Sequence, residues 1–159
     1  MSTDSETPLR NTGDEIRTIV VALDASNGAT AVLARAAHVS RGGAVLHVVH
    51  VFRVSNLDRA RAGAPRPSAD AIEDAKDQLA SYVKSAQSRT RSEVVGHFVM
   101  GDPQTEILRI CDQVAADLLV VGTHDYHGLE RLILGSIAET LVRKAHCSVM
   151  VVRPRKSSA

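Results

Sequence analysis

Short runs of β-branched and aliphatic residues, separated by stretches with helical periodicity, constrain the fold of this chain more than any other feature. Strands are expected over residues 17–23, 44–51, 93–100, 117–121 and 147–152. Helices are expected between them, over about residues 29–40, 70–89, 103–114 and 136–145. Strands that alternate with helices of about ten or more residues predict a parallel sheet with helices on both faces. The sequence therefore predicts a doubly wound α/β domain.

Length and local composition limit the domain organisation. A chain of 159 residues is long enough to bury one core and short for two. Residues 1–15 are polar and lack periodicity, so we expect a disordered leader there. Residues 16–155 are expected to form a single domain.

Charge and aromatic content argue against several classes of partner. Charged residues make up 23% of the chain and leave a net charge of +1, while aromatic residues reach 3% with no tryptophan. Neither a strong basic field nor stacking platforms are available, so we expect no nucleic acid partner. No apolar run approaches the ~20 residues of a membrane span, and the first residues do not resemble a secretory signal. We therefore expect a cytoplasmic protein without membrane contact.

The two cysteines do not indicate a structural disulfide. Cys111 falls within a helical pattern and Cys147 at the start of the last strand. In a reducing compartment a stable bridge between them is not expected. The sequence favours buried, inert thiols.

A glycine-bearing segment joins the fourth predicted strand to the last helix and suggests phosphate binding. Gly122 can adopt dihedral angles that other residues avoid, and Gly135-Ser136 precedes a helix whose free amides and dipole favour an anion. A second interpretation uses the same hydroxyl, because Ser136 and Glu139 fit a capping box. Asp24, at the end of the first strand, is likewise either a turn residue or a ligand contact.

Five motifs in the same order give the chain a resemblance to the universal stress protein family. They are residues 18–26, Leu46-His-Val-Val49, Gly101-Asp-Pro-Gln-Thr-Glu-Ile107, residues 122–136 and Cys147-Ser-Val-Met-Val-Val-Arg-Pro154. The resemblance implies an adenine nucleotide alpha hydrolase-like fold with strand order 3-2-1-4-5. It also implies a ligand crevice beyond the carboxyl ends of strands one and four.

The same resemblance implies which residues contact a nucleotide. The phosphate motif falls on Gly122, Asp125, Gly135 and Ser136, and Asp125 stands where the family has a glycine. A carboxylate ~4 Å from a phosphate charge costs between about 1 and 4 kcal/mol, unless a cation or a nearby histidine offsets it. Asp24 is expected near the ribose or a metal. The complete set of expected contacts is Ala22, Asp24, Val48, Val121, Gly122, His124, Asp125, Gly135, Ser136 and Ile137.

The predicted function is a stress-response protein that binds ATP or another adenine nucleotide, with or without magnesium, as a signal. One alternative is a dimeric interaction module that no longer binds nucleotide, and another is a slow ATPase. No nucleophile and base pair stands out, so we expect binding and not catalysis. The resemblance also implies a homodimer through Ser148 to Val152, which would otherwise be an apolar edge strand.

Overall fold

The computed structural model describes residues 15–26, 28–40, 43–54, 66–123 and 134–153, and all nine predicted elements lie within them. Their bounds differ from the expected ones by a few residues at most, as is usual where helices and strands fray. In chain order the elements are β1 (Thr18–Leu23), α1 (Ala29–Val39), β2 (Val45–Arg53), α3 (Ala69–Gln87), β3 (Val94–Gly101), α4 (Pro103–Gln113), β4 (Leu118–Gly122), α5 (Ser136–Lys144) and β5 (Ser148–Val152).

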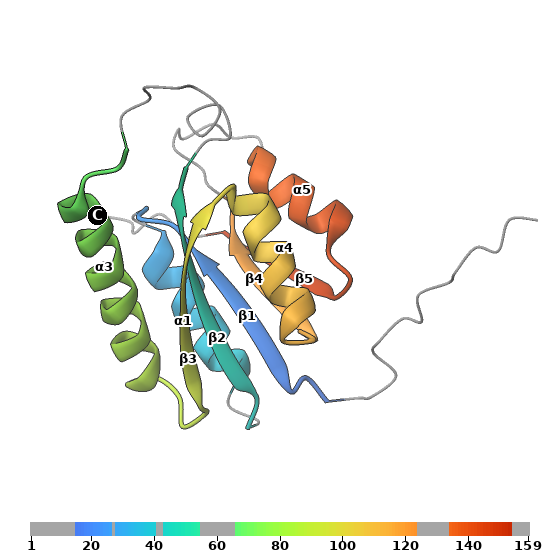
Figure 1. The fold of residues 1–159 in the computed structure, drawn as a ribbon. Coiled ribbons are helices and arrows are strands. Elements are labelled where there is room, and N and C mark those ends of the chain that lie inside the picture. The colour runs from blue at the N-terminus through green and yellow to red at the C-terminus, as the bar shows by residue number, and fades with distance from the viewer. Residues whose placement is uncertain (1–14, 27, 41–42, 55–65, 124–133, 154–159) are drawn as a thin grey trace, which may run out of the picture.

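The described strands form one parallel sheet in the order β3-β2-β1-β4-β5, which confirms the predicted order. Helices α1 and α3 cover one face, and α4 and α5 cover the other (Figure 1). The doubly wound fold class is therefore confirmed. Winding reverses between β1 and β4, which are neighbours in the sheet although far apart in sequence.

Each face of the sheet has its own hydrophobic core, and the central strands contribute to both. Ile19 and Val21 pack under α1 and α3, whereas Val20 packs under α4 and α5. All three side chains are 0% exposed. Burial on both faces explains why β1 is a continuous apolar run without alternation.

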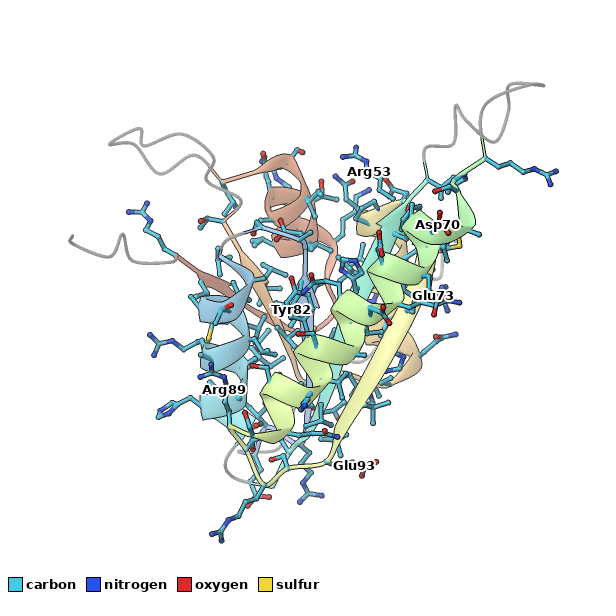
Figure 2. The ribbon with its side chains drawn as sticks, turned by 90° about the vertical axis from the view of Figure 1, so that its left-hand side faces the viewer. Arg53, Asp70, Glu73, Tyr82, Arg89 and Glu93 are labelled. Atoms are coloured by element: carbon cyan, nitrogen blue, oxygen red, sulfur yellow. The ribbon has the colours of Figure 1, made fainter. Side chains whose placement is uncertain are left out.

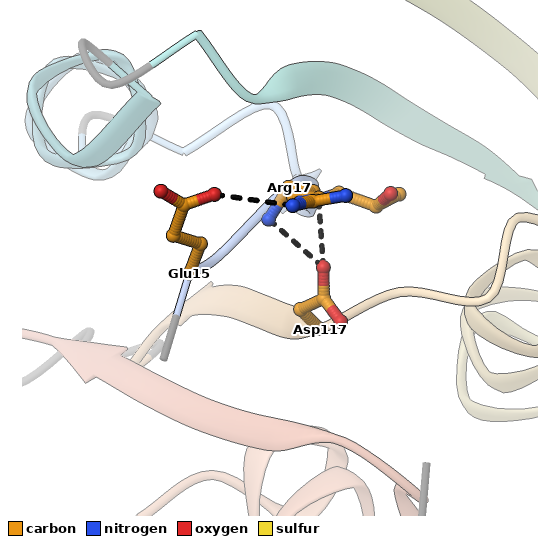
Figure 3. Close-up of polar contacts among 4 residues, drawn as sticks. Glu15, Arg17 and Asp117 are labelled. Atoms are coloured by element: carbon orange, nitrogen blue, oxygen red, sulfur yellow. Dashed lines mark hydrogen bonds and ion pairs between the residues drawn. The ribbon is translucent and has the colours of Figure 1, made fainter. Parts of the chain in front are cut away.

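Asp117 connects the amino ends of three neighbouring strands through hydrogen bonds (Figure 3). Its Oδ2 accepts hydrogen bonds from the main-chain amides of Arg17 and Thr18, both at 2.9 Å. Its own amide donates to the Thr18 carbonyl at 2.8 Å, and its carbonyl accepts from Ser148 at 3.2 Å. One residue thus links the starts of β1, β4 and β5.

Helix α4 begins as the sequence predicts. Asp102 is its N-cap and accepts a hydrogen bond from the Thr105 amide at 3.0 Å, with Pro103 directly after it. Hydrogen bonds from the Thr105 amide and hydroxyl lower the pKa of Asp102. An N-cap carboxylate of this kind satisfies free amides at the helix start.

The capping box predicted at α5 is wrong. Gly135, in extended conformation at φ −60° and ψ 153°, is the N-cap, so Ser136 is the first helical residue, and no side chain with a described position caps the helix. Glu139 instead pairs with Arg143 at 3.1 Å, one turn along the same helix. Among the described residues, no side chain therefore accepts from the first amides of α5.

Other sequence expectations remain predictions. The leader predicted over residues 1–15 lies almost entirely outside the described residues, so its disorder and the domain limits are untested. Within the described part of the chain, no helix combines the length and the apolar character needed to cross a membrane.

Candidate functional site

The carboxyl ends of β1 and β4 lie side by side, because Val21 is paired with Val120 in the parallel register. After β1 the chain leads to α1 on one face, whereas after β4 it leads to α5 on the other face. Ligands of doubly wound sheets bind at such a switch point. The first residues beyond the two strands are Asp24 and Thr123.

Asp24 shapes the turn after β1. Its Oδ1 accepts a hydrogen bond from the Ser26 amide at 3.1 Å, and the Tyr82 hydroxyl donates to its carbonyl at 2.8 Å. Tyr82 extends from α3 toward this turn (Figure 2), and burial together with the Asp24 charge raises the pKa of its hydroxyl. Asp24 does not cap α1, because Gly28 is the N-cap there. The side chain of Asp24 is exposed at the carboxyl edge of the sheet.

His50 also belongs to this edge, although the sequence analysis gave it no role. Its Nδ1 donates to the Leu23 carbonyl at 3.0 Å, and its ring lies edge-on to Tyr82. The buried ring therefore holds the end of β1 in place from β2. A histidine within an apolar run gives no sequence signal that it will meet the last carbonyl of another strand.

Gly122 has a structural reason to be glycine. A Cβ at this position would lie 3.1 Å from Cγ2 of Val32, a residue of α1. The missing side chain lets α1 approach the end of β4 closely. This packing reason for glycine at position 122 is independent of any role in binding a phosphate.

Thr123 joins the end of β4 to two other elements. Its amide donates to the Val152 carbonyl at 3.2 Å, and its carbonyl accepts from the Gly135 amide at 3.4 Å. Its side chain is 1% exposed, and Oγ1 has no hydrogen-bond partner in the part of the chain that the structure describes. A buried hydroxyl without a partner is costly, and such groups often mark a functional position.

The amino termini of α4 and α5 meet beside this threonine. Nε2 of Gln104, in the first turn of α4, donates to the Ser136 carbonyl at 3.5 Å. Ser136 is exposed and Gly135 is half-buried. Two helix dipoles thus present their positive ends at the carboxyl edge, one capped by Asp102 and one uncapped.

The structure brings some of the predicted contact residues together and separates others. Ala22, Val121 and Ile137 meet in the core under α4 and α5, where Ala22 and Ile137 remain partly exposed. Val48 is 0% exposed and lies in the other core, under α1 and α3. His124 and Asp125 lie outside the described residues.

The chemistry available at this edge is hydrogen bonding and charge. Among the residues with described positions, no three histidine, cysteine or acidic side chains gather in a way that could hold a metal ion. The groups at hand are free helix amides, one buried hydroxyl, the Asp24 carboxylate and half-buried apolar side chains. This set suits an anion attached to a flat, partly apolar ligand.

Comparison with known proteins agrees with this geometry. The model of the universal stress protein family matches residues 15–153. A universal stress protein of Methanocaldococcus jannaschii is 27% identical over 150 residues, which are 93% of this chain and 88% of the relative. The structure of an Archaeoglobus fulgidus universal stress protein aligns with a TM-score of 0.69 at 28% identity, over 86% of this chain and 98% of that one.

A second Archaeoglobus fulgidus structure, a complex with dAMP, aligns with a TM-score of 0.65 at 27% identity. It covers 85% of this chain and 96% of the other. Fold, strand order and family model lead to the same assignment. This chain belongs to the universal stress protein family.

Proposed function

We propose that this chain binds an adenine nucleotide at the carboxyl ends of β1 and β4 and acts as a regulatory module. The observation that carries the proposal is the buried hydroxyl of Thr123, which has no partner among the described residues, beside the amino terminus of α5, which no described side chain caps. A phosphate oxygen could accept hydrogen bonds from both. On binding, the protein would then form the hydrogen bonds that these donors lack in the free state.

The nucleoside would lie on the β1 side of the crevice. Asp24 offers an exposed carboxylate for ribose hydroxyls or a cation, and Ala22 and Ile137 offer partly exposed apolar surface. Val121 and Val48 are buried beneath this surface and would support it from the two cores. The dAMP complex of the Archaeoglobus fulgidus relative supports adenine as the base.

The role of magnesium depends on carboxylates near the phosphates. Asp24 is one, and Asp125, within residues 124–133, is the other predicted one. A divalent cation between a carboxylate and a phosphate would remove the repulsion that Asp125 otherwise brings. We therefore propose that magnesium strengthens binding of ATP more than binding of AMP.

Calorimetric titration of ATP and AMP, each with and without magnesium, tests the proposal. Wild type is expected to bind, and Thr123→Val, which keeps the shape but removes the hydroxyl, should weaken binding about tenfold. Thr18→Val, at the opposite edge of the sheet, is the matched control and should not change affinity. Absence of binding by wild type under all four conditions would overturn the proposal.

The second candidate is a module that works through protein contacts alone, and Asp125 favours it. If Asp125→Gly binds ATP and wild type does not, this chain lost its nucleotide at that position. Binding by both proteins supports the first proposal. The third candidate, a slow ATPase, would require a base and a held water at this edge.

We also propose a homodimer through β5, the strand at one end of the sheet. Val149, Met150 and Val151 remain half-buried in the single chain, and a five-residue apolar strand at an edge invites pairing. Val151→Lys should give a folded monomer in analytical ultracentrifugation. Val142→Lys, on the 47% exposed surface of α5, is the control and should leave the dimer intact. A dimer that survives Val151→Lys at micromolar concentration would contradict this arrangement.

A further inference from the structure

The chain's two cysteines lie next to each other in space, although the sequence favoured buried, inert thiols without a structural disulfide. Cys111 is in the last turn of α4, and Cys147 directly precedes β5. The two thiols are hydrogen-bond partners, and both side chains pack in the core under α4 and α5. Both are reduced in this structure.

The neighbours of both cysteines hold the two segments together. His146 Nδ1 lies 3.2 Å from Oδ1 of Asp112, so the residues beside the cysteines are in contact as well. On the other side of Cys147, the Ser148 amide donates to the Asp117 carbonyl at 3.2 Å. The segment that carries Cys147 is therefore fixed at one flank against the end of α4 and at the other against the residue that precedes β4.

The two thiols differ in their exposure to solvent. Cys111 is 4% exposed, and its hydrogen bond to Cys147 together with burial raises the pKa of its thiol. Cys147 is partly exposed, and the same hydrogen bond lowers the pKa of its thiol. Contrary to the sequence expectation, Cys147 is thus not fully buried. A partly exposed thiol in contact with a second thiol is the arrangement that a redox-reactive pair requires.

We propose that Cys111 and Cys147 form a reversible disulfide between α4 and the start of β5 when a peroxide oxidises the protein. The proposal goes beyond nucleotide binding and does not depend on it. The contact between the thiols, the two fixed flanks and the solvent access of Cys147 carry it.

The reaction balances in two steps. The Cys147 thiolate attacks one peroxide oxygen, an S–O bond forms, the O–O bond breaks, and the leaving hydroxide takes a proton to become water. The Cys111 sulfur then attacks the Cys147 sulfenic acid, an S–S bond forms, the S–O bond breaks, and the thiol proton leaves with the hydroxide as a second water. Each sulfur loses one electron and the peroxide gains two. A small dithiol reverses the change by thiol–disulfide exchange.

The test treats the reduced, folded full-length protein with hydrogen peroxide and maps its peptides without reduction. We expect both free thiols to disappear together, the mass to fall by about 2 Da, and one peptide pair to contain Cys111 and Cys147 within a single chain. Dithiothreitol should restore both thiols. Because the chain contains only two cysteines, the map has no competing intramolecular pair.

Two variants check the order of events. In Cys111→Ser, the Cys147 sulfenic acid has no resolving thiol, so a sulfenic-acid trap such as dimedone should label it at least about tenfold more than in wild type. In Cys147→Ser, the buried Cys111 should resist peroxide. Circular dichroism verifies that each variant is folded, and the wild-type map tests the pair even if one variant is not.

Three results would overturn the proposal. One is a Cys147 sulfinic acid formed while Cys111 remains a free thiol. Another is a Cys147 bridge found only between two chains, which would show that the edge strand brings the cysteine to a partner. The third is loss of both thiols only after urea is added, which would mean that the folded chain keeps them apart.

Discussion

At the amino ends of β1 and β4, the Asp117 carboxylate accepts two main-chain hydrogen bonds, and the main chain of the same residue makes two more. At the carboxyl ends of the same strands, the Thr123 hydroxyl is buried and has no partner within the described residues. Three strands are tied together at one end, and two helix amino termini meet at the other. The paired strands thus divide two tasks between their ends. One end contributes stability, and the other, where we propose that the nucleotide binds, leaves a buried polar group unsatisfied at a cost in stability.

The largest change in the free energy of unfolding is expected at the amino ends of the strands, where Asp117 links them. Asp117→Ala leaves the Arg17 and Thr18 amides without their acceptor and should lower the free energy of unfolding by about 2 kcal/mol. Asp112→Ala, which removes only an exposed contact with His146, should cost less than about 0.5 kcal/mol. Urea denaturation measures both. Equal losses in the free energy of unfolding in the two variants would mean that the Asp117 hydrogen bonds stabilise the protein no more than an ordinary surface contact.

At the carboxyl ends of the same strands, removing a polar side-chain group should raise the free energy of unfolding, opposite to the effect of Asp117→Ala. Thr123→Val exchanges the unpartnered hydroxyl for a methyl group of similar size and should raise the free energy of unfolding by about 1 kcal/mol without ligand. Thr18→Val, whose side chain is half-buried, should change it by less than about 0.5 kcal/mol. Thermal and urea unfolding of the nucleotide-free protein decide the sign. A clear loss of stability in Thr123→Val would mean that the hydroxyl is already satisfied.

The two helix starts at the carboxyl edge allow a finer comparison. Asp102→Ala removes the N-cap of α4 and should cost about 1 kcal/mol at neutral pH, whereas Ser136→Ala should cost less than about 0.5 kcal/mol because Gly135 is the N-cap of α5. Because the pKa of Asp102 is lowered in the folded state, its contribution is present above its ordinary pKa of 3.8 and is lost as the pH falls through the folded value. The difference between Asp102→Ala and wild type should therefore shrink in acid. If Ser136→Ala lost as much free energy of unfolding as Asp102→Ala, Ser136 would be a capping residue after all.

The smallest effect is expected between the two edges, on the face under α4. His47 Nδ1 and His97 Nε2 are 2.9 Å apart, so one ring nitrogen donates and the other accepts. Burial is the main cause that lowers the pKa of each histidine. The charge of His97 lowers the pKa of His47 further, against the opposing charge of Glu93. The charge of Arg109 lowers the pKa of His97 further. The folded state then binds fewer protons than the unfolded state, so this pair's stabilisation is complete above about pH 6.5 and decreases as the pH falls below it.

The His47–His97 effect is measured as the urea midpoint at pH 7.5 and at pH 5.5. His97→Gln should show a smaller drop between the two conditions than wild type. His38→Gln, an exposed histidine at the end of α1, is the control and should keep the wild-type drop. An unchanged drop in His97→Gln would place the pH dependence elsewhere in the chain.

Much of the fold was predictable because its signals are local. The apolar run within residues 17–23 indicated a strand buried on both faces, and Asp102-Pro103 indicated a helix start by the chemistry of two adjacent residues. The strand order came from the family resemblance. Spacing alone does not show that β1 pairs with β4 across most of the chain.

The site was less predictable because its features depend on distant contacts or on one backbone angle. Ser136 and Glu139 have the spacing of a capping box, but the extended conformation of Gly135 moves the helix start by one residue. Thr123, His50 and Asp117 gain their roles from carbonyls and amides of other strands. Cys111 and Cys147 meet only because α4 ends beside the start of β5. No local pattern carries that information.

The strand order also has a consequence for the chain as it leaves the ribosome. β1, β2 and β3 emerge first and can pair with one another, but the free side of β1 waits for β4, almost a hundred residues later. Until then a fully apolar central strand presents its unpaired amides and carbonyls to other nascent chains. The interval between the synthesis of β1 and that of β4 is therefore the one in which misassembly is most probable. Pairing of residues 118–122 with β1 ends it.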